Sequence, residues 1–177
     1  MWHAPLEPMS DESIKVQTGH ANVGLVHRAL LLEMHPRGLK RRPMSTRILL
    51  ADDNVLVRDL IRQLLELRPE WKVCAQAANG VEAVDQARAT SPDLAILDIL
   101  MPFENGIEAG RKINRVCATT AVLAMSGYEP EIFISRLLGA GIQGFVSKTF
   151  LCSELIPAVE TLLRGETYFR LSKSQNA

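Results

Sequence analysis

The sequence has few cysteines and no long apolar run. Its three cysteines, Cys74, Cys117 and Cys152, are too widely spaced for a disulfide framework or for the paired ligands of a zinc site. No apolar run approaches the roughly 20 residues that a transmembrane helix needs. The first residues lack the charged-then-apolar order of a secretory signal. We therefore expect a soluble, cytoplasmic protein without membrane contact.

The chain also lacks an excess of charge of either sign. Its 20 Lys and Arg balance its 20 Asp and Glu, so it has none of the positive field that duplex nucleic acid usually demands. Composition therefore argues against direct binding of nucleic acid. With 47% hydrophobic residues, a chain of 177 residues is long enough to bury one core of ordinary domain size.

Residues 1–44 differ in pattern from the rest of the chain. They hold all four histidines, several prolines and a basic cluster, without sustained strand alternation. The histidines are not spaced like common metal ligands. We expect an N-terminal extension that is disordered or not part of the native chain, because the patterned sequence starts directly after Met44. Residues 170–177 are expected to form a C-terminal tail.

From residue 45 onward, short apolar runs alternate with longer helical segments. This order is typical of a parallel sheet with helices on its faces. The predicted strands cover 47–51, 72–77, 94–97, 121–125 and 144–147. Helices are predicted to begin near Val55, Gly80, Gly106, Glu131 and Ser153. Right-handed crossovers then give a doubly wound α/β fold, whose ligands bind beyond the carboxyl ends of the strands.

Candidate site residues, all polar except one glycine, follow four of these five predicted strands. In chain order they are Asp52 and Asp53, Asp98, Ser126 and Gly127, and Lys148. Taken alone, each such residue is more often part of a turn or a helix cap. Because a parallel sheet brings the strand ends to one edge, we expect three carboxylates, a hydroxyl and an ammonium to converge on one pocket.

Three clustered carboxylates repel one another unless a cation neutralises them, so the cluster predicts a hard divalent ion, Mg²⁺ or Mn²⁺. With the ion bound, one aspartate can attack a phosphoryl donor and form an aspartyl phosphate. Lys148 would then offer a positive charge to the phosphoryl oxygens, and Ser126 a hydroxyl donor. Gly127 would leave open space for the approach of the backbone.

Four segments in this order carry a family resemblance: RILLADDN, LAILDILMPFENG, VLAMSG and GFVSK. Together they resemble the signature blocks of response-regulator receiver domains of two-component systems, over residues 45–169. The resemblance implies a flavodoxin-like (βα)5 fold with a five-stranded parallel sheet in the order 2-1-3-4-5. It implies no enzyme activity beyond Mg-dependent self-phosphorylation and dephosphorylation.

The resemblance also implies roles in phosphoryl transfer. Asp98 is implied as the phosphoacceptor, and Lys148 and Ser126 as groups that contact the phosphoryl group. Phe145, three residues before the lysine, is implied as the aromatic that turns inward on activation. It would act together with Ser126 as the switch.

A set of metal ligands is implied by the same resemblance. Asp53, Asp98 and the backbone carbonyl of Leu100 are implied as direct ligands of Mg²⁺. Asp52 is implied as a ligand through a bound water. The remaining neighbours on this loop are interpreted as scaffold residues.

We expect a stand-alone response regulator that takes its phosphoryl group from a histidine kinase or a phosphotransfer protein. It would signal through a downstream protein target or a homodimer. The segment RGETYF resembles receivers that precede a LuxR-type helix-turn-helix domain, but only eight residues follow Phe169, so we expect no output domain.

Three alternatives stay open. The first is a phosphorylation-independent binding module on a receiver fold, and the second is a truncated transcriptional regulator. The third is a haloacid-dehalogenase-like phosphatase, which usually needs a second aspartate two residues after the nucleophile. Leu100 occupies that position in this sequence.

Overall fold

Strands and helices alternate along the described chain. The computed structural model describes residues 45–128 and 133–170, so the expected extension over 1–44 and nearly all of the expected tail lie outside it. Its elements are β1 (Thr46–Ala51), α2 (Val55–Glu66), β2 (Trp71–Ala77), α3 (Gly80–Thr90), β3 (Leu94–Asp98), α4 (Gly106–Val116), β4 (Ala121–Ser126), α5 (Ile134–Gly139), β5 (Gly144–Ser147), the 3₁₀ turn η2 (Lys148–Phe150), α6 (Leu151–Leu163) and β6 (Tyr168–Phe169).

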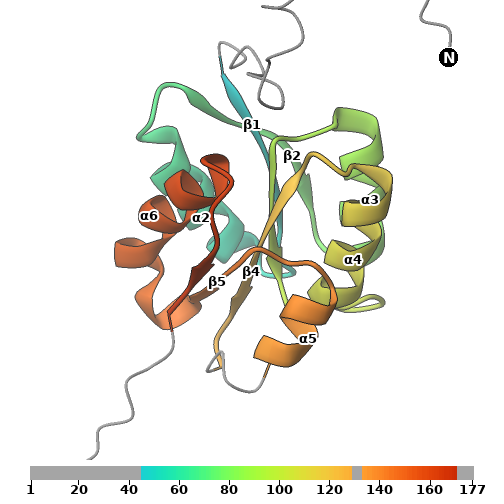
Figure 1. Ribbon diagram of the computed structural model, residues 1–177. Coiled ribbons are helices and arrows are strands. Elements are labelled where there is room, and N and C mark those ends of the chain that lie inside the picture. The colour runs from blue at the N-terminus through green and yellow to red at the C-terminus, as the bar shows by residue number, and fades with distance from the viewer. Residues whose placement is uncertain (1–44, 129–132, 171–177) are drawn as a thin grey trace, which may run out of the picture. The chain divides into compact units, whose positions relative to one another are not determined.

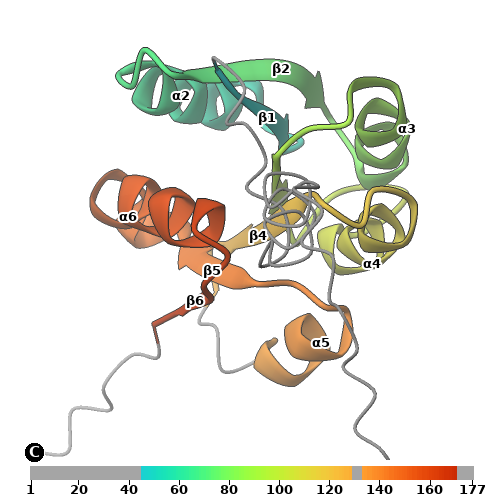
Figure 2. The ribbon, with the colours of Figure 1, turned by 45° about the horizontal axis from the view of Figure 1, so that its top comes forward.

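The strands form one parallel sheet with helices on both faces. Their order is β2-β1-β3-β4-β5-β6, which confirms the predicted order 2-1-3-4-5 and adds a sixth strand at the β5 edge. Helices α2 and α6 cover one face, whereas α3 and α4 cover the other (Figures 1 and 2). The strand order reverses between β1 and β3, which is where doubly wound folds bind ligands.

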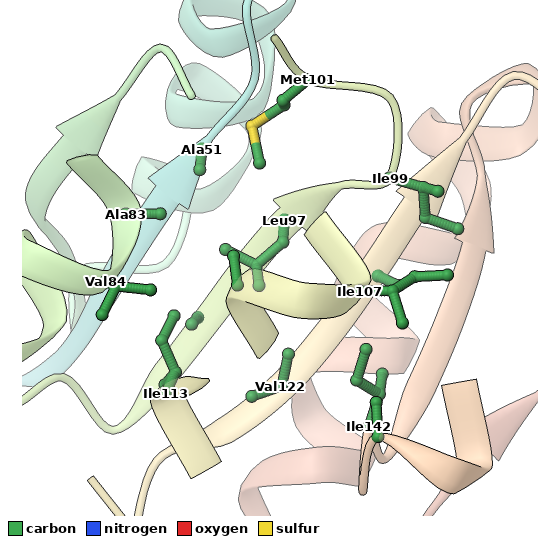
Figure 3. Close-up of a cluster of buried hydrophobic side chains, with 14 of the residues drawn as sticks. Ala51, Ala83, Val84, Leu97, Ile99, Met101, Ile107, Ile113, Val122 and Ile142 are labelled. Carbon is green, nitrogen blue, oxygen red and sulfur yellow. The ribbon is translucent and has the colours of Figure 1, made fainter. Parts of the chain in front are cut away.

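Both faces of the sheet are packed. In β1, Ile48 and Leu50 face the layer formed with α2 and α6, whereas Leu49 and Ala51 face the layer formed with α3 and α4. Figure 3 shows the second of these layers, where side chains of α3 and α4 meet those of the strands. Because both faces are buried, the strands appear in the sequence as continuous apolar runs instead of alternating ones.

Strand β6 was not predicted, because two residues show no periodicity. Its register places Tyr168 beside Gly144 and Phe169 beside Phe145 of β5. Tyr168 packs in the layer of α2 and α6, and Phe169 packs against the opposite layer. The two aromatic side chains therefore continue the two-faced alternation of the sheet.

Asparagine side chains cap the first three helices. Asn54, Asn79 and Asn105 each accept hydrogen bonds from backbone N–H groups in the first turn of α2, α3 and α4. Such a cap satisfies donors that have no partner inside the helix. These starts agree with the positions predicted from the sequence.

Of the last two predicted helix starts, only that of α6 can be compared with the structure. Glu131 lies outside the described residues, and α5 begins at Ile134. Helix α6 begins at Leu151, ahead of the predicted Ser153, because the turn η2 leads directly into it. The hydroxyl of Ser153 donates to the carbonyl of Phe150 and so does not cap the helix.

Gly106 allows α4 to begin against the end of β3. A Cβ atom at this position would lie 2.1 Å from the carbonyl oxygen of Asp98. The N–H of Gly106 also donates to the carbonyl of Ile99 over 3.0 Å. The atoms nearest to this Cβ belong to the backbone, so no flexible side chain could move aside to make room for it. Only glycine fits this position.

Replacing Gly106 by alanine is expected to lower the free energy of unfolding by about 2 kcal/mol, the usual scale of overpacking. Denaturation in urea measures the change. Gly139→Ala is the matched control, because no atom lies within 4 Å of its added Cβ and it lies within α5. A Gly106→Ala variant as stable as the control would show that the contact is wrongly described.

Candidate functional site

Three carboxylates meet at the carboxyl edge of the sheet. Asp52 and Asp53 follow β1, and Asp98 is the last residue of the neighbouring strand β3. One carboxylate oxygen from each lies within 4.8 Å of the others. Asp52 and Asp98 are buried, whereas Asp53 is exposed. The structure thus brings together the three acidic residues that the sequence pointed to.

Lys148 provides the positive charge for this group. It follows β5 directly, and its Nζ lies 2.7 Å from Oδ2 of Asp52 and 2.8 Å from Oδ2 of Asp98. Its side chain is only 23% exposed. Two buried carboxylates therefore share one partly buried ammonium, and this geometry makes the ion pairs stronger than surface pairs.

Burial and charge act against each other at Asp98 and Lys148. Burial raises the pKa of Asp98, and the hydrogen bond and charge of Lys148 offset only part of this rise. Burial lowers the pKa of Lys148, but its contacts with Asp52 and Asp98 outweigh burial and leave that pKa raised. The pocket therefore favours a charged lysine and makes ionisation of Asp98 costly.

Backbone N–H groups orient two of the carboxylates. The N–H of Leu100 donates to Oδ1 of Asp98 over 3.3 Å, and the N–H of Asn54 donates to Oδ1 of Asp52 over 2.9 Å. Leu100 therefore lies beside Asp98 through its main chain, while its side chain is half exposed. Both loops present their carboxylates in set orientations.

The remaining predicted residues lie at the ends of β4 and β5. Ser126 is fully buried, and its Oγ accepts a hydrogen bond from the N–H of Tyr128 over 3.1 Å. Its own hydroxyl hydrogen stays available to donate. Gly127 is exposed, and a Cβ there would meet nothing within 4 Å. Phe145 is buried in the layer that also holds Leu137.

The residues at this edge fit a hard divalent cation. The three side chains that could hold an ion offer only carboxylate oxygens, which Mg²⁺ prefers. The buried Oδ2 of Asp52 lies 2.7 Å from the ammonium of Lys148, which Asp98 shares. One ammonium can balance only one of the three carboxylate charges, so a divalent cation would neutralise the remainder.

Sequence patterns did not point to Arg58, which also contacts the site. Its Nη1 donates to the backbone carbonyl of Asp52 over 2.6 Å. The one available signal was its place in the first turn of a helix that starts right after the acidic pair. An arginine there is usually interpreted as a solvated residue.

Sheet topology and pocket together define a class: a doubly wound parallel domain with an acidic pocket and a lysine at its carboxyl edge. Residues 48–160 match the response regulator receiver domain family. The chain belongs to this family. Its relatives and structural neighbours include LuxR-type regulators, which confirms the resemblance to the receivers of that group.

Among the relatives, a putative transcriptional regulator of Pseudomonas aeruginosa is 39% identical over 124 residues, which are 70% of this chain and 59% of that protein. The chemotaxis protein CheY of Halobacterium salinarum is 32% identical over 120 residues, which are 68% of this chain and 98% of that protein. The chain spans little more than half the length of the first relatives it matches, 59% and 57%.

Solved structures show the same fold. The crystal structure of a LuxR-family two-component response regulator from an Aurantimonas species is 35% identical, with a TM-score of 0.67 over 70% of this chain and 89% of that one. The signal receiver domain of the putative response regulator NarL from Mycobacterium tuberculosis is 27% identical, with a TM-score of 0.66 over 70% of this chain and 100% of that one.

The raised pKa of Asp98 predicts a pH-dependent effect of Asp98→Asn. Without divalent ions at neutral pH, the variant is expected to melt at a higher temperature, because it removes a buried charge. A raised pKa favours the protonated folded form, so the difference should shrink as the pH falls toward the ordinary value of 3.8. Thermal melts across this range measure the difference, with Asp59→Asn on α2, whose side chain is 47% exposed, as control. A difference independent of pH would contradict the assignment.

Proposed function

We propose that this receiver domain accepts a phosphoryl group on Asp98 from a histidine kinase or a phosphotransfer protein. The observation that carries the proposal is the position of Asp98 at the end of β3. There its carboxylate contacts the Lys148 ammonium and the N–H of Leu100, within reach of two further carboxylates. A nucleophile, a positive charge and a set of cation ligands are thus gathered in one place.

Transfer from phosphohistidine needs little of the protein beyond this arrangement. An oxygen of Asp98 bonds to phosphorus while the phosphorus–nitrogen bond breaks, and the departing imidazole takes up a proton from water. Lys148 faces the phosphoryl oxygens with its ammonium, and Ser126 donates its hydroxyl hydrogen to one of them. Gly127 leaves the space that these oxygens occupy.

Asp53, Asp98 and the carbonyl of Leu100 would hold Mg²⁺ or Mn²⁺ directly, and Asp52 would hold it through a water. The ion supplies charge that neutralises the phosphoryl oxygens during transfer. Lys148 alone cannot balance three carboxylates and an incoming phosphoryl group. We propose that the domain carries out only its own Mg-dependent phosphorylation and dephosphorylation and is not an enzyme on other substrates.

Phe145 and Ser126 are proposed as the switch. They lie on neighbouring strands, with Ala124 beside Phe145 and Ser126 beside Ser147 in the ladder of β4 and β5. Movement of the Ser126 hydroxyl toward a phosphoryl group would change the space next to β5. The ring of Phe145 is buried in the same layer as Leu137, and Phe145 pairs with Phe169 in the ladder of β5 and β6, so a change at this ring could pass to α5 or β6.

Exposed apolar side chains around the pocket support a protein as the donor. Large apolar residues that are at least half exposed follow the ends of four strands: Val55 and Leu56, Leu100 and Phe103, Tyr128, and Phe150. Phe103 is 91% exposed and has a φ of 64°, a left-handed conformation that costs a non-glycine residue roughly 1–2 kcal/mol. The fold itself gains little from this ring, which suits contact with a partner.

We further propose a stand-alone regulator in the cytoplasm that signals to a protein target or through a homodimer, without direct contact to nucleic acid. Support comes from CheY of Halobacterium salinarum, 98% of which aligns with this chain. The matching transcriptional regulators keep the truncated regulator as an alternative. Within the described residues, none of the helices has the length and apolar character needed to cross a membrane.

Incubation with acetyl phosphate and Mg²⁺, followed by intact-mass measurement, tests the acceptor. The wild type is expected to gain one phosphoryl group, whereas Asp98→Ala and a sample with chelator are expected to gain none. No gain in the wild type, even with a kinase, would favour the phosphorylation-independent binding module. A gain in Asp98→Ala would place the acceptor elsewhere.

Replacing Phe103 by asparagine tests the protein donor. Asparagine tolerates a positive φ, so the free energy of unfolding should rise by about 1 kcal/mol. The rate of phosphoryl transfer from a phosphorylated phosphotransfer protein should fall several-fold, while the rate with acetyl phosphate stays unchanged. Leu67→Asn, at the far end of α2 and 73% exposed, is the control. Equal loss with both donors would argue against a docking role.

A further inference from the structure

A bulge in β2 changes which face of the sheet its last residues point to. The register pairs Ile48 with Val73 but Leu49 with Ala75, so Cys74 is the extra residue. Before the bulge, Val73 packs in the layer of α2 and α6, whereas after it Ala75 packs in the layer of α3 and α4. Bulges are known to redirect side chains next to functional sites.

The bulge brings Gln76 to the side of the sheet that α2 covers. Gln76 pairs with Leu50, whose side chain lies in the layer of α2 and α6. Without the extra residue, Gln76 would point to the opposite face, because successive side chains alternate. Its Oε1 instead accepts a hydrogen bond from Nε of Arg58, 3.3 Å away on α2.

The same guanidinium reaches the acidic turn. Nη1 of Arg58 donates to the carbonyl of Asp52 over 2.6 Å. Arg58 thus joins three parts of the edge: the end of β1, the end of β2 and the first turn of α2. Arg62, one turn further along the same helix, instead pairs with Asp59 and Glu66 on the surface. Among the described residues, Arg58 makes no ion pair.

We propose that Arg58, oriented by Gln76, is a positioning residue for the divalent cation. By holding the carbonyl of Asp52, it sets the direction in which the Asp52 and Asp53 side chains leave the main chain. The inference rests on the proposed cation site. Residues that orient metal ligands without touching the metal typically change its affinity 10–100-fold when they are mutated.

The direction in which Mg²⁺ affinity changes when Arg58 is replaced distinguishes a positioning role from an effect of its charge alone. A positive guanidinium close to the pocket repels a cation, so its removal by itself should tighten Mg²⁺ binding. If Arg58 positions the carboxylates, its removal should weaken binding in spite of the lost repulsion. A purely structural role would lower the melting temperature of the variant and leave its affinity unchanged.

The experiment measures binding of Mg²⁺ to the full chain by calorimetry, and of Mn²⁺ by the electron paramagnetic resonance signal of the free ion. Arg58→Met is expected to raise the dissociation constant roughly tenfold, and Arg58→Lys to raise it less, since a lysine keeps one donor for the carbonyl. Arg62→Met, which removes a charge from the same helix, should stay within about twofold, as expected for an exposed side chain.

Gln76→Leu gives an independent arm if Arg58→Met folds poorly, because Gln76 is exposed on an edge strand. It should weaken binding about threefold. The double variant should bind no worse than Arg58→Met, because both substitutions disrupt the same contact between Arg58 and the Asp52 carbonyl. Tighter or unchanged binding in Arg58→Met and Gln76→Leu would overturn the positioning role alone. A wild type that binds neither ion would overturn the proposed cation site together with it.

Discussion

One ammonium shared by two buried carboxylates governs this domain. Lys148 lies within 2.8 Å of an oxygen of Asp52 and of Asp98. Without it, two charges would be buried side by side and would repel each other at close range. The pairing also links the ends of β1, β3 and β5. In the sheet, β1 and β3 are neighbours, and β4 lies between β3 and β5. The pocket is therefore complete only when β1, β3 and β5 are in place.

The same pairing suggests how Lys148 and the proposed divalent ion would divide the neutralisation of the carboxylates between them. Lys148 balances part of the negative charge of Asp52 and Asp98. The proposed divalent cation would add the charge that the lysine lacks, so that the ammonium could face an incoming anion. The main chain of Asp98 is also closely packed, because a Cβ atom at Gly106 would lie 2.1 Å from its carbonyl oxygen.

Much of the fold could be predicted because both faces of the sheet are covered. Continuous apolar strands and regular spacing indicated the parallel sheet, and the polar residues at the strand ends indicated the pocket. Strand β6 was missed because a two-residue strand is specified by its partner β5 and not by its own pattern. The start of α6 was missed because η2 depends on how the chain leaves β5.

Arg58 and Gln76 could not have been paired from the sequence, since the bulge that brings them together is invisible there. Alternation through β2 without an extra residue would send Gln76 to the wrong face. Likewise, the strained backbone of Phe103 shows only in the structure. The contact between Arg58 and Gln76 depends on the register of β2, which the sequence pattern does not show, and it lies next to the acidic site.

Strand β6 attaches the end of the described chain to the sheet. The N–H of Tyr168 donates to the carbonyl of Gln143 over 3.0 Å, and two aromatic side chains anchor the strand on opposite faces. Because the ladder has only two residues, β6 is stabilised mainly by the burial of these two rings. Local opening of β6 therefore costs less than opening of the central strands. This edge of the sheet is therefore held less firmly than its centre.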